Sequence, residues 1–180
     1  GLSGGLTAAP GQEVQIFTVG LTGDGVKQVN AVDITLSDLT AATGIVKEDF
    51  TALKIYHSAD AVLDGGDTEI GSKAQDDINF GAKTKLNVAP PHKPANGVEE
   101  FYIISALFTT TVTDGHAFKL SFGAGDIATN NGPKGTAVGA SDANSMKADV
   151  VATRLVLTTQ PAPLSTVSAT NLDFTTDPVV

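Results

Sequence analysis

Apolar residues recur at every second position through most of this 180-residue chain, and this alternation constrains its fold more than any other feature. Successive side chains of a β-strand point to opposite faces, so a period of two predicts strands, whereas a helix shows a period of 3.6. The alternation is clear in Val32, Ile34 and Leu36. Residues 101–108 are almost wholly apolar, with aromatic and β-branched side chains, and are predicted to form the central buried strand.

Further strands are predicted at 14–21, 118–122 and 151–157, with shorter candidates at 53–56, 78–80 and 86–88. Clusters of Gly, Asp and Asn separate them, and residues 113–116 give the best hairpin signal. One short helical turn is expected within 37–50, with Lys47, Glu48 and Asp49 as its polar side. The predicted fold is all-β: an antiparallel β-sandwich of immunoglobulin-like or jelly-roll type with an extended terminal segment.

The chain divides into three predicted parts: a flexible N-terminal segment (1–13), a sandwich domain (14–159), and a proline hinge with an extended segment (160–180). The hinge follows from Gln160-Pro161-Ala162-Pro163. The tail after it is β-prone and apolar, so it either pairs back onto this sheet, begins a next domain, or adds to a neighbouring subunit's sheet. The missing initiator Met leads us to expect a removed leader or a trimmed sequence.

Composition excludes several classes of function. The chain carries 11 Lys+Arg against 20 Asp+Glu, a net charge of −9, and its only Arg is Arg154. Such a chain cannot form the basic footprint of a nucleic-acid binder or an anionic-membrane binder. No Cys is present, and no apolar run reaches the roughly 18–20 residues of a membrane span. The low charged fraction of 17% is typical of secreted microbial proteins and favours an extracellular or cell-surface location.

One stretch has the composition of a cation site. Residues 60–69 place four carboxylates on a Gly-bearing loop, and Ca²⁺ prefers such oxygen ligands on a turning backbone: Asp60, Asp64, Asp67 and Glu69. The spacing differs from that of the EF-hand, and Val62 and Leu63 stand where ligands would be expected. Two interpretations remain open, a calcium site and a solvated hairpin.

Catalytic motifs are not found in the sequence. His57, His92 and His116 are far apart and lack the short ligand spacings of zinc sites; three histidines could converge, but solvated or capping histidines are more frequent. The adjacent carboxylates of Asp76-Asp77 and Glu99-Glu100 would face opposite ways in strands. Asp24 and Asp126 have the context of turn residues. The chain is therefore predicted not to be an enzyme.

Several segments resemble a known family. They are Phe17-Thr18-Val19-Gly20-Leu21-Thr22-Gly23-Asp24-Gly25, Leu53-Lys54-Ile55-Tyr56 leading into 63–72, 100–106, and 152–162. Together they resemble a β-sandwich, immunoglobulin-like repeat domain of large secreted surface or filament proteins of bacteria and archaea. The resemblance implies a structural and adhesive role, and an Asp-rich, calcium-like loop in the middle motif, where His57, Ala59 and Ala61 depart from the family's usual acidic or Asn residues.

These observations predict a structural subunit of an extracellular microbial filament, pilus-like fibre or surface layer. Copies of the chain would join head-to-tail by β-strand addition, which need not close and can propagate. The expected donor is 164–174, with 1–11 as second choice, and the side chains expected to fill the neighbour's groove are Leu164, Val167, Ala169, Leu172 and Phe174. The alternative is a calcium-dependent module that binds carbohydrate, surface glycans or other cells through the 60–69 loop.

Overall fold

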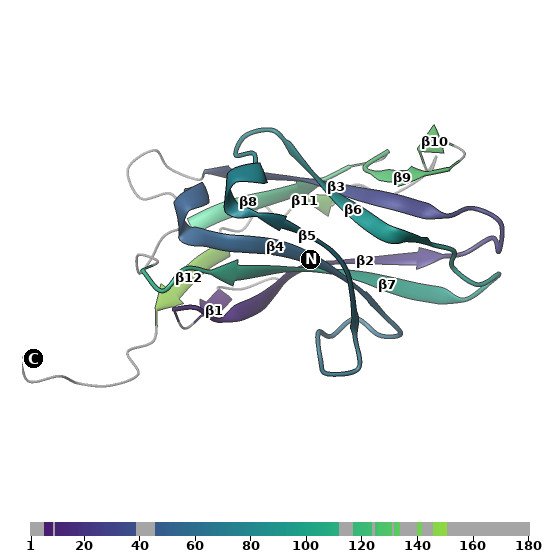
Figure 1. Cartoon of the computed structure of the whole chain (residues 1–180), viewed down its shortest axis with the longest axis horizontal. Helices are drawn as coiled ribbons and strands as arrows, with labels where there is room; N and C mark the ends of the chain where they lie inside the picture. Colours follow the sequence, from purple (N-terminus) through teal and green to yellow (C-terminus); the bar gives the residue numbers. More distant parts are fainter. Residues whose placement is uncertain are drawn as a thin grey trace, which may run out of the picture.

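The computed structural model of the chain describes residues 6–8, 10–38, 46–111, 117–123, 125–130, 132–133, 140–141 and 146–150. These residues form two sheets, and nearly all strand pairs are antiparallel. Helix within them is confined to two 3₁₀ turns, η1 (Lys47–Asp49) and η2 (Gln75–Asp77). Figure 1 shows the sheets as two layers, which confirms the all-β sandwich prediction. No helix in the described part of the chain is long and apolar enough to cross a membrane.

The first sheet has four strands in the order β2-β7-β4-β5. Their bounds are β2 (Glu13–Thr22), β7 (Glu99–Phe108), β4 (Phe50–Ser58) and β5 (Thr68–Ala74). β7 is central, as predicted for 101–108, and its residues 102–106 are all buried. A strand covered on both faces needs apolar side chains at consecutive positions, which explains why this segment does not alternate.

The second sheet is built around β3 (Val29–Asp38). β3 pairs along one edge with β6 (Lys83–His92) and along the other with β8 (Ala117–Phe122) and β9 (Ile127–Thr129). Shorter strands extend it: β10 (Gly132–Pro133), β11 (Ala140–Ser141), β12 (Met146–Val150) and β1 (Leu6–Ala8). β1 pairs with β12 in parallel and lies within the N-terminal segment predicted to be flexible.

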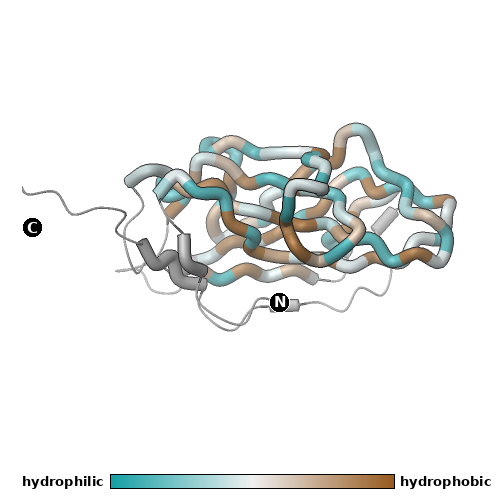
Figure 2. Tube along the Cα trace, turned by 90° about the horizontal axis from the view of Figure 1, so that it is seen from below, coloured by the Kyte–Doolittle hydropathy of each residue, from teal (hydrophilic) through white to brown (hydrophobic). Residues whose placement is uncertain are grey.

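The core lies between the sheets and contains the apolar side chains that alternate along the predicted strands. Val32, Ile34 and Leu36 of β3 are 0% exposed, and Figure 2 shows hydrophobic residues alternating with hydrophilic ones along the strands. Aromatic rings fill the centre: Phe50 lies 5.2 Å from Phe108 and 5.8 Å from Phe118, between ring centroids. Edge-on and offset ring contacts of this kind add to the burial energy of the side chains.

Local details agree with the sequence in most places. The helical turn expected within 37–50 is η1. Residues 78–80 do not form the expected strand: Ile78 ends η2, and Phe80 makes one isolated bridge to Leu36. The predicted hairpin at 113–116, the strand at 151–157 and the hinge and tail at 160–180 lie outside the described residues.

Candidate functional site

An edge strand, β2, is the first candidate site. In the described part of the chain, β2 has a hydrogen-bonded strand on one side only, β7. Its ten residues include one charged side chain, Glu13, and neither Lys nor Pro. After a register irregularity between Gln15 and Phe17, its pairing runs regularly to Thr22. A long and uncharged edge presents unpaired backbone groups to another strand, so β2 has the character of a docking edge.

The edges on the opposite side of the sandwich are protected. β6 carries Lys83 and Lys85 and ends in Pro90, Pro91 and His92, while β5 carries Glu69 and Lys73. Charged residues and prolines of this kind discourage the addition of another strand. β5 and β6 also lie side by side, and at Gly71 the backbone of β5 comes so close to Asn87 of β6 that a side chain would not fit. Strand addition is therefore favoured at β2 over these two edges.

The 60–69 loop uses its acids to hold its own backbone. Asp60 Oδ1 accepts a hydrogen bond from the Val62 amide (2.9 Å), Asp64 Oδ1 from the Gly66 amide (2.7 Å), and Asp67 Oδ2 from the Asp64 amide (2.8 Å). These are the short side-chain-to-backbone bonds that stabilise turns. Asp60 and Asp64 are exposed, as the solvated-hairpin interpretation expects. The calcium interpretation stays a prediction.

β2 also holds this loop. Gln15 Nε2 donates to the Ala61 carbonyl (2.8 Å), and Gln15 Oε1 accepts from the Leu63 amide (2.8 Å). The side-chain amide of Gln15 thus donates a hydrogen bond to a residue 46 positions away and accepts one from a residue 48 positions away. The loop is thereby fixed against β2 on the face of the first sheet that points away from the core.

The fourth predicted calcium ligand, Glu69, belongs to a different group, which we call the outer polar row: Glu13, Ser105, Lys54, Tyr56 and Glu69. It crosses all four strands of the first sheet. Glu13 Oε1 accepts from Ser105 Oγ (2.6 Å) and Tyr56 OH (2.7 Å), and Glu13 Oε2 accepts from Lys54 Nζ (3.0 Å). Lys54 Nζ lies 3.2 Å from Glu69 Oε2.

Electrostatics in the outer polar row favour the charged forms of its acid and base. Burial alone would raise the pKa of the Glu13 carboxyl, but hydrogen bonds from Ser105, Tyr56 and Lys54 outweigh it and hold this pKa below its ordinary value. The hydrogen bond to Glu13 raises the pKa of Lys54. Burial, followed by the bond to Glu13, raises the pKa of Tyr56 to about 12. Glu13 and Lys54 therefore stay ionised at neutral pH while Tyr56 keeps its proton, and their hydrogen bonds link strands of the first sheet.

A second candidate site joins the two sheets at the end of the sandwich near the β2–β3 turn. His57 is the next-to-last residue of β4, Glu100 is the second residue of β7, and His92 ends β6 of the other sheet. Glu100 Oε2 accepts from His57 Nε2 (2.8 Å) and from His92 Nε2 (2.6 Å). The imidazole centroids are 4.0 Å apart. We call these three residues the His-His-Glu cluster.

Glu100 is held ionised within this cluster. Burial works against its charge, but hydrogen bonds from the Ala95 amide (2.9 Å), His92 and His57 lower its pKa to about 2. Because a carboxylate only accepts, each imidazole donates from Nε2. Two residues further along β7, the hydroxyl of Tyr102 is buried and finds no hydrogen-bond partner among the described residues. Its ring centroid lies 6.2 Å from that of His57 and 6.1 Å from that of His92.

The described residues contain one group of three or more His, Asp and Glu side chains whose ligand atoms all lie within 4.8 Å of one another, and it is the His-His-Glu cluster. No ligand spacing in the sequence indicates this cluster, because His57 and His92 belong to strands of different sheets. The third histidine, His116, lies outside the described residues. The register of β4 on β7 places His57 opposite Tyr102, two residues from Glu100, and the packing of the two sheets brings His92 of β6 against this pair.

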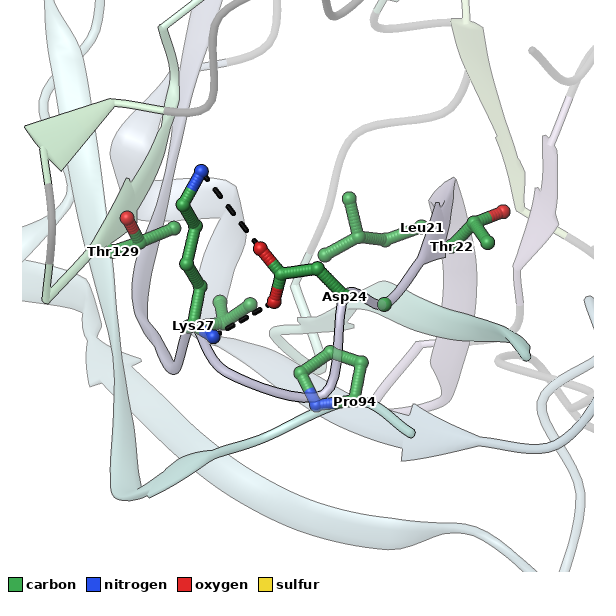
Figure 3. A pocket seen from close by; sticks show the side chains of 8 residues that line it. Leu21, Thr22, Asp24, Lys27, Pro94 and Thr129 are labelled. Carbon is green, nitrogen blue, oxygen red and sulfur yellow. Dashed lines mark hydrogen bonds and ion pairs between the residues drawn. The ribbon is translucent and has the colours of Figure 1, made fainter. Parts of the chain in front are cut away.

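The same end of the sandwich has a small surface pocket beside the β2–β3 turn (Figure 3). Its carboxylate, Asp24, accepts hydrogen bonds from the Val26 and Lys27 amides (2.9 and 2.8 Å) and lies 3.8 Å from Lys27 Nζ. Asp126 similarly accepts from the Gly123 amide (2.6 Å) and pairs with Lys83. Both acids are turn residues, as predicted.

The predicted interface residues Leu164, Val167, Ala169, Leu172 and Phe174 lie outside the described part of the chain. Neither a protein-family model nor a curated protein matches this sequence. Function is therefore argued from the β2 edge and the clusters described above.

Proposed function

We propose that this chain is a structural subunit of an extracellular microbial filament, pilus-like fibre or surface layer. Neighbouring copies join head-to-tail when an extended segment of one subunit pairs with β2 of the next. In this proposal the chain is a building element of the assembly rather than an enzyme, and its partners are copies of itself.

The observation that carries the proposal is the unequal protection of the edges. β2 is ten residues long and has a single charged side chain, whereas β5 and β6 carry charges or prolines and lie against each other. Backbone hydrogen bonds supply affinity in strand addition, and alternate side chains of the added strand supply specificity. β2 has a buried apolar set, Ile16, Phe17 and Val19, which an added strand would extend.

The proposed donor is residues 164–174 of the neighbouring copy. Apolar and polar residues are interspersed in this segment, and its apolar members are Leu164, Val167, Ala169, Leu172 and Phe174. A donor at one end of the chain and an acceptor edge in its body form a heterologous contact, which generates an open filament when the rotation between subunits does not close.

The test compares the full chain with a chain that ends at Thr159. We expect the full chain to form regular fibres in negative-stain images and the shortened chain to remain as isolated particles. A synthetic peptide of residues 164–174 should bind the shortened chain and, added in excess, slow polymerisation of the full chain. Polymerisation of the shortened chain to the same extent as the full chain would refute the proposal.

A charge on the acceptor edge provides a second test. Thr18→Lys places a charge on β2, and Thr51→Lys is the matched control on β4, which has strands on both sides. We expect Thr18→Lys to slow fibre growth and Thr51→Lys to leave it unchanged, because edge charges oppose strand addition. Equal growth of both folded variants would place the contact elsewhere.

A further inference from the structure

The His-His-Glu cluster brings three possible metal-ligand atoms within 4.8 Å of one another. Two imidazole nitrogens and one carboxylate oxygen from three different strands meet at one point. Imidazole nitrogen and carboxylate oxygen are the usual non-sulfur ligands of Zn²⁺ and related divalent transition metals, whereas Ca²⁺ prefers oxygen alone. The donor set therefore selects a transition metal over calcium.

A modest opening of the cluster would admit an ion. The Nε2 atoms now lie 2.8 and 2.6 Å from Glu100 Oε2. Tetrahedral ligands at about 2.0–2.1 Å from zinc are roughly 3.3 Å from one another. Movement of each imidazole by about half an ångström would thus convert the hydrogen-bonded triad into three ligands, with the ring protons transferred from Nε2 to Nδ1.

Accessibility and charge also suit an ion. The side chains of His57 and His92 are each 28% exposed and that of Glu100 is 14% exposed, so solvent reaches the ligand atoms. The Glu100 carboxylate offers an oxygen ligand and the two imidazoles offer nitrogen ligands to a divalent cation.

Tyr102 gives an independent observation. The residue is 0% exposed, and in the part of the chain that the structure describes its hydroxyl has no hydrogen-bond partner. A buried unsatisfied hydroxyl costs free energy, so such a group in a folded protein needs an explanation, of which an ion or its bound water is one. Its ring packs within 6.2 Å of both imidazoles, and the residue follows Glu100 on the same face of β7.

From these observations we propose that His57, His92 and Glu100 form a binding site for one divalent transition-metal ion, of which Zn²⁺ is the representative. The fourth coordination position is open to water. Since His92 belongs to one sheet and His57 and Glu100 to the other, the ion clamps the two layers at this end of the sandwich. The chain has no cysteine, so a metal clamp supplies the cross-link that a disulfide supplies elsewhere.

The experiment is a Zn²⁺ titration of the full chain by calorimetry in a buffer that does not bind metals. We expect one ion per chain, a thermal midpoint that rises with Zn²⁺ concentration, and no displacement by equimolar Ca²⁺. His57→Ala and Glu100→Gln should each weaken binding by at least about 100-fold, since even second-shell changes cost about 10–100-fold. His116→Ala and Asp64→Asn are the matched controls and should leave the affinity unchanged.

The wild-type chain also gives a test that does not depend on variants. Histidine ring signals in NMR spectra should show two imidazoles shifting together as one equivalent of Zn²⁺ is added, and Co²⁺ should give the visible absorption of a four-coordinate site. Absence of stoichiometric binding, binding that His57→Ala leaves intact, or a shift confined to His116 would each overturn the proposal. Failure here leaves the polymerisation tests unaffected, because they depend on β2.

Discussion

Replacing Gly71 by alanine tests how the sandwich closes on the side away from β2. Gly71 lies in β5, opposite Ile55 of β4, at the point where β5 comes against β6 of the other sheet. A Cβ built there would clash with the backbone carbonyl oxygen of Asn87 and would lie 3.2 Å from both Asn87 C and Ile55 Cγ2. The obstacle is mainly backbone, so no side-chain rotation relieves it.

The size of the effect follows from this geometry. An ordinary contact requires β5 and β6 to separate by roughly 1 Å or more, and overpacking of this kind costs about 1–3 kcal/mol. We place Gly71→Ala at the upper end, about 3 kcal/mol, because a carbonyl in a strand cannot move alone. The smaller entropy of the unfolded alanine chain offsets about 0.4–1 kcal/mol, which leaves a net loss of about 2 kcal/mol.

The assay is thermal unfolding followed by circular dichroism, with urea unfolding as a check. For a chain of this size, about 2 kcal/mol lowers the thermal midpoint by roughly 4–8 °C. Gly65→Ala is the matched control, because a Cβ at Gly65 meets no atom within 4 Å. It should leave the midpoint unchanged or raise it slightly. A Gly71→Ala midpoint equal to that of the wild type, or equal losses in both variants, would refute the close approach of β5 and β6.

Two further predictions concern the first sheet. Glu13→Gln should lower the free energy of unfolding by about 1.5–3 kcal/mol near pH 7, since Glu13 accepts hydrogen bonds from charged and neutral donors in the outer polar row. The pKa of Glu13 is lower in the folded state, so its contribution is complete above the unfolded pKa near 4.3 and is lost as the pH falls through the folded pKa. Urea unfolding at pH 7, 5 and 3 should therefore show the difference between wild type and variant shrinking toward pH 3; a constant difference would exclude this linkage. Gln15→Ala should cost about 1 kcal/mol and speed proteolysis within 59–67, because the loop loses both of its hydrogen bonds to Gln15. An unchanged cleavage rate would show that other contacts, such as the bond from Thr18 Oγ1 to the Ala61 carbonyl, hold the loop.

The strands and their faces were predictable from the sequence because they depend on local alternation. Val32, Ile34 and Leu36 are fully buried in β3, and the continuous apolar run at 101–108 is the central strand β7. The prediction of a strand at 78–80 was wrong for a related reason. Three residues are too few to distinguish a strand from the end of a 3₁₀ turn.

The site residues were harder to predict from the sequence, because which side chains meet depends on which strands are neighbours. Asp60, Asp64, Asp67 and Glu69 are close in sequence, yet Glu69 turns to Lys54 while the other three bond to their own loop. His57 and His92 are remote in sequence, yet the centroids of their rings lie 4.0 Å apart. Side chains that are close in sequence need not meet at one site, because successive residues of a strand point to opposite faces of the sheet.

By itself, the sequence determined that this chain forms an all-β core and carries a net charge of −9, because period, composition and charge are properties of the chain alone. Only the tertiary structure decided that β2 is the lightly protected edge, that the outer polar row crosses four strands, and that two histidines share one carboxylate. Sheet order and register bring these residues together, and both are set by the packing of the whole core, which no local segment encodes.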